Sequence, residues 1–303
     1  MTLKELSTKC LQHITVIFNS CLHLSHFPSQ WKFAEIILVP KPNKPENDIG
    51  SYRPISLLSI LSKVFEKIIL RRVMPILDQK NAIPDHQFGF RAKHGTPEQV
   101  HRIVRKILDG FESKQYCSAV FLDIKQAFDK VWHNGLLFKI KRLLPAPLYV
   151  LLKSYLTNRE FTVRFGGENS EIKPILAGVP QGSVLGPILY SIYTADMPTL
   201  ADRSLLVATY ADDTAILSTS ASSSSASSLL QTQLDELEKW LDNWNIVVNK
   251  DKSSHVTFSL RKGDCSSVCL HNVPIPSKQE VSYLGMKLDR RLCWKPHIAS
   301  KRK

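Results

Sequence analysis

This chain of 303 residues lacks long apolar runs and lacks cysteines in a disulfide or zinc pattern, and each absence excludes a class of protein. No apolar run reaches the roughly 20 residues that cross a bilayer, and the first residues lack the pattern of a signal peptide. The six cysteines are scattered, which is typical of a reducing compartment. Cys265, Cys269 and His271 have neither the spacing nor the fourth ligand of a zinc site. The sequence therefore predicts neither a membrane protein nor a disulfide or zinc scaffold.

Acidic residues are too few to balance the basic ones. The chain has 27 Asp and Glu against 40 Lys and Arg, a net charge of +13. This excess suits a polyanionic partner such as nucleic acid, although a basic surface can also serve solubility alone. The length and the 43% hydrophobic content predict a large core divided into two or three subdomains.

Two neighbouring acids lie between two apolar runs in the second half of the chain. Asp212 and Asp213 are preceded by residues 205–209 and followed by residues 214–217. This pattern predicts a β-hairpin with both carboxylates at its tip. Such a turn is either an ordinary solvated one or a site for a hard divalent cation such as Mg²⁺.

A third acid and a glycine-rich block accompany the hairpin. Residues 119–122 predict a buried strand that ends at Asp123, where its carboxylate could bridge two metal ions about 3.5–4 Å apart together with the hairpin acids. Residues 178–187 contain three glycines and two prolines, which predict a loop whose backbone approaches a ligand closely. Proline at position 187 suits the first turn of a helix through residues 188–193.

These three blocks, in this order, resemble the palm motifs of reverse transcriptases. Further segments resemble the jockey group of non-LTR (LINE-type) retrotransposons: residues 31–34, 51–58, 86–91, 249–253, 283–285 and 288–292. The resemblance covers essentially the whole chain, and no acid position departs from the family pattern. Such elements usually carry an endonuclease before this region and a full thumb after it, so we expect a truncated copy.

The resemblance implies an α+β fold: a right-hand polymerase core of fingers and palm, with an antiparallel palm sheet and the thumb largely missing. We place the fingers at residues 1–117, the palm at 118–278, and the primer grip with the start of the thumb at 279–303. The implied activity is that of an RNA-directed DNA polymerase, in which a primer 3′-hydroxyl attacks a deoxynucleoside triphosphate paired to an RNA template.

Two Mg²⁺ ions follow from the same resemblance, and Mn²⁺ can substitute for them. We assign direct ligation to Asp123 and Asp212, with the backbone carbonyl of Ile124 completing the coordination. Asp213 is assigned as the supporting catalytic acid, which orients the site.

Nucleotide contacts are expected from Lys41, Arg53, Phe128, Gln181, Gly182 and Lys252. Lys41 and Arg53 leave proline-stiffened loops and suit phosphate oxygens, while Gln181-Gly182 would lie against the nascent base pair. Phe128 either excludes a ribose 2′-hydroxyl sterically or packs the turn as a core residue. Lys252 lies near the triphosphate in the family pattern, or it is a solvated turn lysine.

Nucleic-acid contacts are expected from Arg91, which also suits the triphosphate, and from a primer grip at Tyr283, Leu284 and Gly285. Lys63, Lys67 and Arg71 recur every fourth residue and share one helix face, which contacts nucleic acid or only solvent.

Five local predictions follow from the sequence patterns. A helix should run from Ile60 to Met74 and stop at Pro75, and a capping box at residues 96–99 should begin the next helix. The serine-rich residues 218–228 predict a mobile surface loop, and an apolar stripe at residues 230–244 predicts a helix packed on the palm sheet. The inward face of the first helix is expected to consist of Leu61, Val64, Phe65 and Ile68.

Two alternative functions remain open. An RNA-directed RNA polymerase also has paired palm acids, but it usually has glycine before them and a small or polar residue in place of Phe128. A catalytically inactive, truncated remnant would only bind RNA. The expected partners are an RNA template, a DNA primer and dNTPs, without a membrane, and the family implies an intracellular location in cytoplasm or nucleus.

Overall fold

The computed structural model describes residues 5–42, 45 and 47–302. The chain forms two compact units that interleave along the sequence: Met1–Ala82 with Phe128–Tyr193, and Ile83–Ala127 with Thr194–Lys303. The boundaries predicted after residues 117 and 278 coincide with neither unit, so the finger, palm and thumb ranges stay predictions. None of the described helices is both apolar enough and long enough to cross a membrane.

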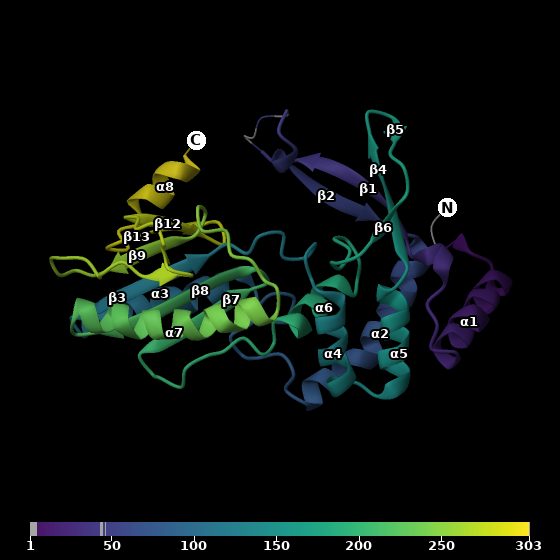
Figure 1. Ribbon diagram of the computed structural model, residues 1–303, viewed down its shortest axis with the longest axis horizontal. Helices are drawn as coiled ribbons and strands as arrows, with labels where there is room; N and C mark the ends of the chain where they lie inside the picture. The colour runs from purple at the N-terminus through teal and green to yellow at the C-terminus, as the bar shows by residue number, and fades with distance from the viewer. Residues whose placement is uncertain (1–4, 43–44, 46, 303) are drawn as a thin grey trace. The chain divides into compact units, whose positions relative to one another are not determined.

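The first unit combines helices with a mixed sheet (Figure 1). Its helices are α1 (Thr8–His23), α2 (Ile60–Gln79), α4 (His133–Leu143), α5 (Ala146–Leu156) and α6 (Gly186–Tyr193), with 3-10 turns η2 (Ser29–Trp31) and η3 (Ile49–Ser51). Its strands are β1 (Phe33–Pro40), β2 (Tyr52–Leu57), β4 (Arg159–Phe165), β5 (Glu168–Asn169) and β6 (Lys173–Ile175). The sheet order is β2-β1-β4-β5, with β6 also paired to β4, and among the described strand pairs of this sheet only β1–β4 is parallel.

Helix α2 differs from its prediction in length and in orientation. It continues past Pro75 to Gln79, because Val73 and Leu77 remain buried on both sides of the proline. Their burial offsets the proline penalty, which is about 3 kcal/mol within a helix. Of the predicted inward face, Phe65 is buried, whereas Leu61, Val64 and Ile68 are only half-buried. The buried face consists of Ser62, Phe65, Glu66, Ile69, Val73 and Leu77.

The second unit is built on an antiparallel sheet, which confirms the predicted palm architecture. The sheet order is β7-β8-β3-β9. The elements of this unit are α3 (Thr96–Glu112), β3 (Tyr116–Leu122), β7 (Leu205–Tyr210), β8 (Asp213–Ser220), α7 (Ser223–Asn243), β9 (Ser254–Phe258), β10 (Cys269–Leu270), β11 (Val273–Pro274), β12 (Glu280–Tyr283), β13 (Met286–Asp289) and α8 (Lys295–Lys301).

Both faces of this sheet are covered. Ala119 and Phe121 of β3 pack into a core with α3 and the β12–β13 hairpin, whereas Val120 and Leu122 pack into a second core with α7. Successive strand residues point to opposite faces, so a strand buried on both faces reads as an unbroken apolar run. The run at 119–122 thus has a structural cause, and it delivers Asp123 at the end of β3.

The serine-rich segment was predicted wrongly as a mobile loop. Strand β8 extends to Ser220 and α7 begins at Ser223, so only two residues separate them. Ser218 is fully buried and donates a hydrogen bond to the Ala226 carbonyl at 2.6 Å. The pairing of β8 with β3 determines this segment's structure, overriding its low-complexity composition.

The predicted helix at 230–244 is confirmed, and the start of α3 is confirmed with a shift of one residue. The stripe at 230–244 lies on α7, where Leu230, Leu234, Leu237 and Leu241 are buried against the sheet, as expected. Helix α3 begins at Thr96, but its N-cap is Gly95, one residue earlier than the capping box at 96–99 implies. The Glu98 carboxylate accepts the Gly95 N–H at 3.0 Å, so Glu98 takes the role assigned to Gln99.

Candidate active site

Strand register brings the three predicted acids together at one end of the strands in the second unit's sheet. Leu122 of β3 pairs with Thr214 of β8. Because the strands are antiparallel, Asp123, the residue after Leu122, lies opposite Asp213. Tyr210 pairs with Asp213 across the β7–β8 hairpin, which leaves Ala211 and Asp212 at its tip. Residues 90 positions apart in sequence thus share a site because β3 and β8 are neighbours in the sheet.

The backbone of Asp123 is anchored to the loop that precedes β9. Its carbonyl accepts the Asn249 N–H at 2.7 Å, and its N–H donates to the Ser253 hydroxyl at 3.2 Å. The same loop carries Lys252, whose Nζ lies 3.9 Å from an Asp123 carboxylate oxygen. This ion pair is exposed, so it contributes little to stability, but it places a cation beside the acids.

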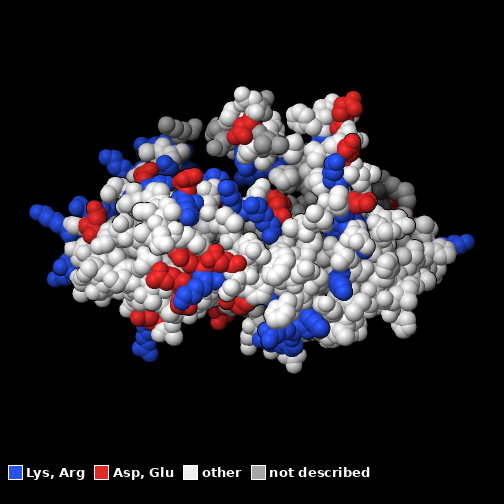
Figure 2. Space-filling view, viewed as in Figure 1, with Lys and Arg blue, Asp and Glu red and all other residues white. Residues whose placement is uncertain are grey.

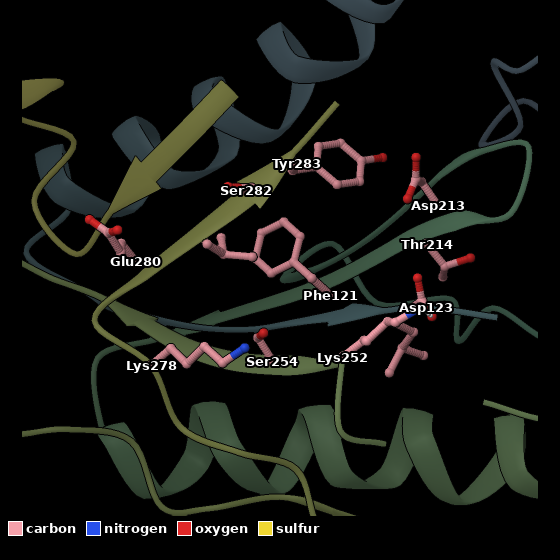
Figure 3. A pocket seen from close by; sticks show the side chains of 12 residues that line it. Phe121, Asp123, Asp213, Thr214, Lys252, Ser254, Lys278, Glu280, Ser282 and Tyr283 are labelled. Atoms are coloured by element: carbon pink, nitrogen blue, oxygen red, sulfur yellow. Dashed lines mark ion pairs between the residues drawn. The ribbon is translucent and has the colours of Figure 1, made fainter. Parts of the chain in front are cut away.

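A pocket of about 310 Å³ opens beside these acids (Figure 3). Asp123 and Asp213 line it together with Lys252, Lys278 and Tyr283. Figure 3 shows the Tyr283 hydroxyl directed towards Asp213. The pocket is therefore lined by carboxylates, ammonium groups and aromatic rings, a combination suited to a metal-bound phosphate ester.

The acids influence one another electrostatically. Burial, together with the neighbouring charges of Asp212 and Asp123, raises the pKa of Asp213 to about 6. Asp213 still keeps solvent access at the start of β8, so its desolvation is partial. Burial also raises the pKa of Asp212, with a smaller contribution from the charge of Asp123. A bound cation would relieve this repulsion.

The carboxylate oxygens of these acids suit hard divalent cations. Within the described ranges, no cluster of three or more His, Cys, Asp and Glu side chains is arranged to hold a metal by itself. Mg²⁺ usually binds one or two protein carboxylates and completes its octahedron with water and substrate phosphates. Asp123 and Asp213 line the pocket and Asp212 lies beside them, so the acids can supply the protein share.

A second group of predicted residues lies together within the first unit. Phe128 is half-buried and stacks on Tyr190, with ring centroids 4.7 Å apart. Its carbonyl accepts the Val179 N–H at 2.8 Å, which connects it to the glycine-rich loop. In that loop Gly182 has a φ of +102°, and a Cβ there would lie 3.1 Å from the Ser56 carbonyl. Only glycine fits this backbone without strain.

Two basic residues of the first unit flank the end of its sheet. Arg53 lies exposed on β2, paired with Val39 of β1. Lys41 follows β1, and its ammonium donates to the Gly50 carbonyl at 2.8 Å. Lys41 is thus held by its own loop, whereas the Arg53 side chain extends into solvent.

The predicted nucleic-acid contacts of the second unit differ in their surroundings. Arg91 donates to the carbonyls of Pro84 and Gln87 at 3.2 and 3.3 Å, so it also braces its own loop. Leu284 and Gly285 form the turn between β12 and β13, with φ values of +46° and +80°. Tyr283 is buried beside Phe121, which sets the hairpin against the core.

Three polar residues at these sites escaped the sequence reasoning. Asp129 accepts a hydrogen bond from the Gln181 amide at 2.9 Å, and Lys278 adds a second ammonium to the pocket. Glu66 is fully buried and accepts the N–H groups of Val184 and Leu185 at 2.8 and 3.0 Å. A polar residue on the inward face of α2 was the available signal for Glu66, but the predicted face did not include it.

Charge is distributed unevenly over the second unit. Figure 2 shows acidic side chains gathered around α7, whose sequence includes Asp235, Glu236, Glu238 and Asp242. A polyanion would be repelled there, whereas Lys252 and Lys278 offer it positive charge at the pocket.

Comparison with known sequences gives a consistent result. A family described as reverse transcriptase (RNA-dependent DNA polymerase) matches residues 39–288. The RNA-directed DNA polymerase from mobile element jockey of Drosophila melanogaster is 48% identical over 99% of this chain. The probable RNA-directed DNA polymerase from transposon X-element of the same species is 46% identical over 98%. The chain spans about a third of each relative, 33% in both cases.

Comparison with solved structures concerns the fold alone. Telomerase from Candida tropicalis in complex with a telomeric RNA fragment superimposes with a TM-score of 0.59, covering 92% of this chain and 47% of that one, at 13% identity. Apo telomerase from the same organism has the same TM-score and covers 94% of this chain and 53% of its own.

Proposed function

This chain belongs to the reverse transcriptase family, the RNA-dependent DNA polymerases, and on that premise we propose that it extends a primer 3′-hydroxyl on an RNA template with dNTPs. The family and the polymerase fold inferred from the sequence are confirmed, including the similarity to jockey-like non-LTR elements. The observation that supports the proposed activity is the strand register by which Asp123 lies opposite Asp213, both lining a pocket with Lys252 and Tyr283.

We propose that Asp123 and Asp212 hold two Mg²⁺ ions, with the Ile124 carbonyl as a further ligand and Asp213 as the supporting acid. Bound ions would lower the pKa of the primer hydroxyl and neutralise charge on the triphosphate. The protein's own share is positioning: it holds the acids on adjacent strands and excludes water from the buried side of the sheet. Lys252 and Lys278 offer ammonium groups to phosphate oxygens at the pocket rim.

Primer extension on an RNA template with Mg²⁺ tests this function, with deoxy- and ribonucleotides supplied separately. A DNA product supports the proposal, whereas an RNA product would support the RNA polymerase alternative. Salt-sensitive duplex binding without any product would support the inactive remnant. Mn²⁺ in place of Mg²⁺ shows whether the weaker geometric demands of that ion rescue synthesis.

Phe128→Val is expected to admit ribonucleotides. The change removes ring volume at the proposed sugar site, and discrimination between dNTP and rNTP should fall by about 10–100-fold. The ratio of kcat/KM for the two nucleotides measures it. Phe138→Val, on an exposed phenylalanine of α4, is the control. Unchanged discrimination together with lower thermal stability would make Phe128 a packing residue against Tyr190.

Arg53→Ala is expected to raise KM for the nucleotide by about tenfold while duplex affinity stays within about twofold. An exposed guanidinium on β2 suits a bidentate contact with phosphate oxygens. Steady-state kinetics and a duplex binding titration together measure the split, with Arg142→Ala on α4 as the control. A larger loss in duplex binding than in KM would make Arg53 a template contact.

The remaining partners and the location are proposals from family membership. We propose an RNA template, a DNA primer, a separate endonuclease function in the full element, and action in the cytoplasm or nucleus. Arg91 and the β12–β13 hairpin, with Tyr283, Leu284 and Gly285, are proposed to contact the nucleic acid. Lys41, Gln181 and Gly182 are proposed to contact the nucleotide.

A further inference from the structure

The side chain of Gln87 is joined to the hairpin that carries the acids. Gln87 is 3% exposed. Its Nε2 donates to the Ala211 carbonyl at 3.3 Å, and its Oε1 accepts the Ala211 N–H at 3.0 Å. The Oε1 atom also accepts the Gly89 N–H at 2.8 Å. The N–H groups of Gly89 and Ala211 need an acceptor, and the Ala211 carbonyl needs a donor. These partners determine which atom of the Gln87 amide is oxygen and which is nitrogen.

Ala211, the residue to which Gln87 hydrogen-bonds, has an unfavourable backbone conformation. Ala211 has a φ of +57°, in the left-handed region that glycine usually occupies. It directly precedes Asp212 in the hairpin turn. Any relaxation of Ala211 towards negative φ would rotate the following peptide and redirect the carboxylates of Asp212 and Asp213.

The backbone around Gln87 packs tightly on the same turn. A Cβ at Gly89 would lie 2.2 Å from the Ala211 nitrogen, so only glycine permits the approach. Phe88 donates its N–H to the Thr209 carbonyl at 2.8 Å, and Thr209 donates to the His86 carbonyl at 2.9 Å. Segment 86–89 therefore pairs with β7, an edge strand of the sheet, and covers it up to the acids.

Helix α3 holds this segment from behind. Gln99 is fully buried, and its amide nitrogen donates to the carbonyls of His86 and Thr209 at 3.3 and 2.9 Å. Arg102 donates to the Gln99 amide oxygen at 2.9 Å. Gln87 is thus supported by a satisfied buried network, which makes its position rigid.

We propose that Gln87 is a positioning residue that holds Ala211 in its left-handed conformation and so directs the Asp212 and Asp213 carboxylates. The inference rests on the proposed function for its kinetic consequence, but not for its effect on the acids themselves. Its signature is a loss of kcat and of metal affinity, without a matching loss of nucleotide or RNA binding.

Gln87→Ala is expected to lower kcat by about 100-fold, because small misplacements of reacting groups have effects of this size. KM for dNTP and Kd for the RNA–DNA duplex should change by less than about threefold. Mn²⁺ binding to the protein without substrate, measured by electron paramagnetic resonance, should weaken by about tenfold or more.

The chain offers a control with the same pairing at a half-buried position. Gln231 on α7 pairs with both backbone groups of Cys269, at 3.1 and 2.8 Å, just as Gln87 pairs with Ala211. Gln231→Ala removes the same kind of contact away from the acids and should leave kcat and Mn²⁺ affinity unchanged. Equal effects of the two variants on both readouts would overturn the proposal, since the loss would then be one of general stability.

A second pair of variants tests the cause. Glycine adopts left-handed φ without steric cost, so Ala211→Gly should make the turn less dependent on Gln87. In the Ala211→Gly background, Gln87→Ala should lower kcat and Mn²⁺ affinity by several-fold less than in the wild type. Equal losses in both backgrounds would overturn the mechanism. If the wild type does not polymerise, the proposed function fails, while the Mn²⁺ titrations still decide the role of Gln87.

Discussion

Replacing Asp212 or Asp123 by alanine is expected to abolish primer extension, with a loss of at least about 1,000-fold in kcat. Each change removes a carboxylate from a site where two or three must share the charge of the bound ions and the triphosphate. Duplex affinity should remain within about twofold, because the acids contribute repulsion and not attraction towards phosphate. Primer extension and a salt-dependent duplex titration on the same preparations measure both effects.

The third acid and a control complete this experiment. Asp213→Ala should leave weak but measurable synthesis if Asp213 supports the ligands instead of binding both ions. The structure makes this a sharp test, because Asp213 lines the pocket together with Asp123. Asp235→Ala, on an exposed position of α7, should be indistinguishable from wild type. Synthesis retained in Asp123→Ala or Asp212→Ala would refute the assignment of the metal ligands.

Glu66→Ala is expected to destabilise the first unit by on the order of 3 kcal/mol. The change leaves the N–H groups of Val184 and Leu185 without their acceptor in a buried site. It also removes the acceptor of the Ser62 hydroxyl, which donates at 3.1 Å, and creates a cavity beside Phe65. Because these N–H groups lie just after Gln181 and Gly182, the glycine-rich loop should become mobile.

Hydrogen exchange followed by mass spectrometry localises the effect of Glu66→Ala. Peptides spanning residues 183–187 should exchange at least about tenfold faster than in wild type, and the urea midpoint should fall. Glu66→Gln keeps the shape and one acceptor, so it should have a smaller effect. Glu168→Ala, on an exposed strand residue, is the control. Unchanged exchange in residues 183–187 would show that the loop does not depend on Glu66.

Local sequence patterns predicted the elements that carry the acids. Apolar runs on both sides of Asp212-Asp213 were enough to predict the β7–β8 hairpin, because two apolar runs joined by a short acidic turn leave few other structures. The run before Asp123 was enough to predict the end of β3, since a strand covered on both faces is mostly apolar. Both predictions concern residues close together in the sequence.

Predictions failed where long-range packing outweighed local preference. Pro75 does not end α2, because burial of Val73 and Leu77 outweighs the missing hydrogen bond. The serines at 218–228 are not a loop, because β8 pairs with β3 as far as Ser220. In both cases the deciding contact comes from another part of the chain, which composition does not report.

The sequence by itself determined the chemistry of this protein: which acids are present, which strands end at them, and the family to which the chain belongs. Only the tertiary structure decided how those acids are held. Gln87 reaches Ala211 across 124 residues of sequence, and Glu66 reaches Val184 across 118. The physical reason is that hydrogen bonds between side chain and backbone depend on distance in space, and such pairs leave no periodic signal along the chain.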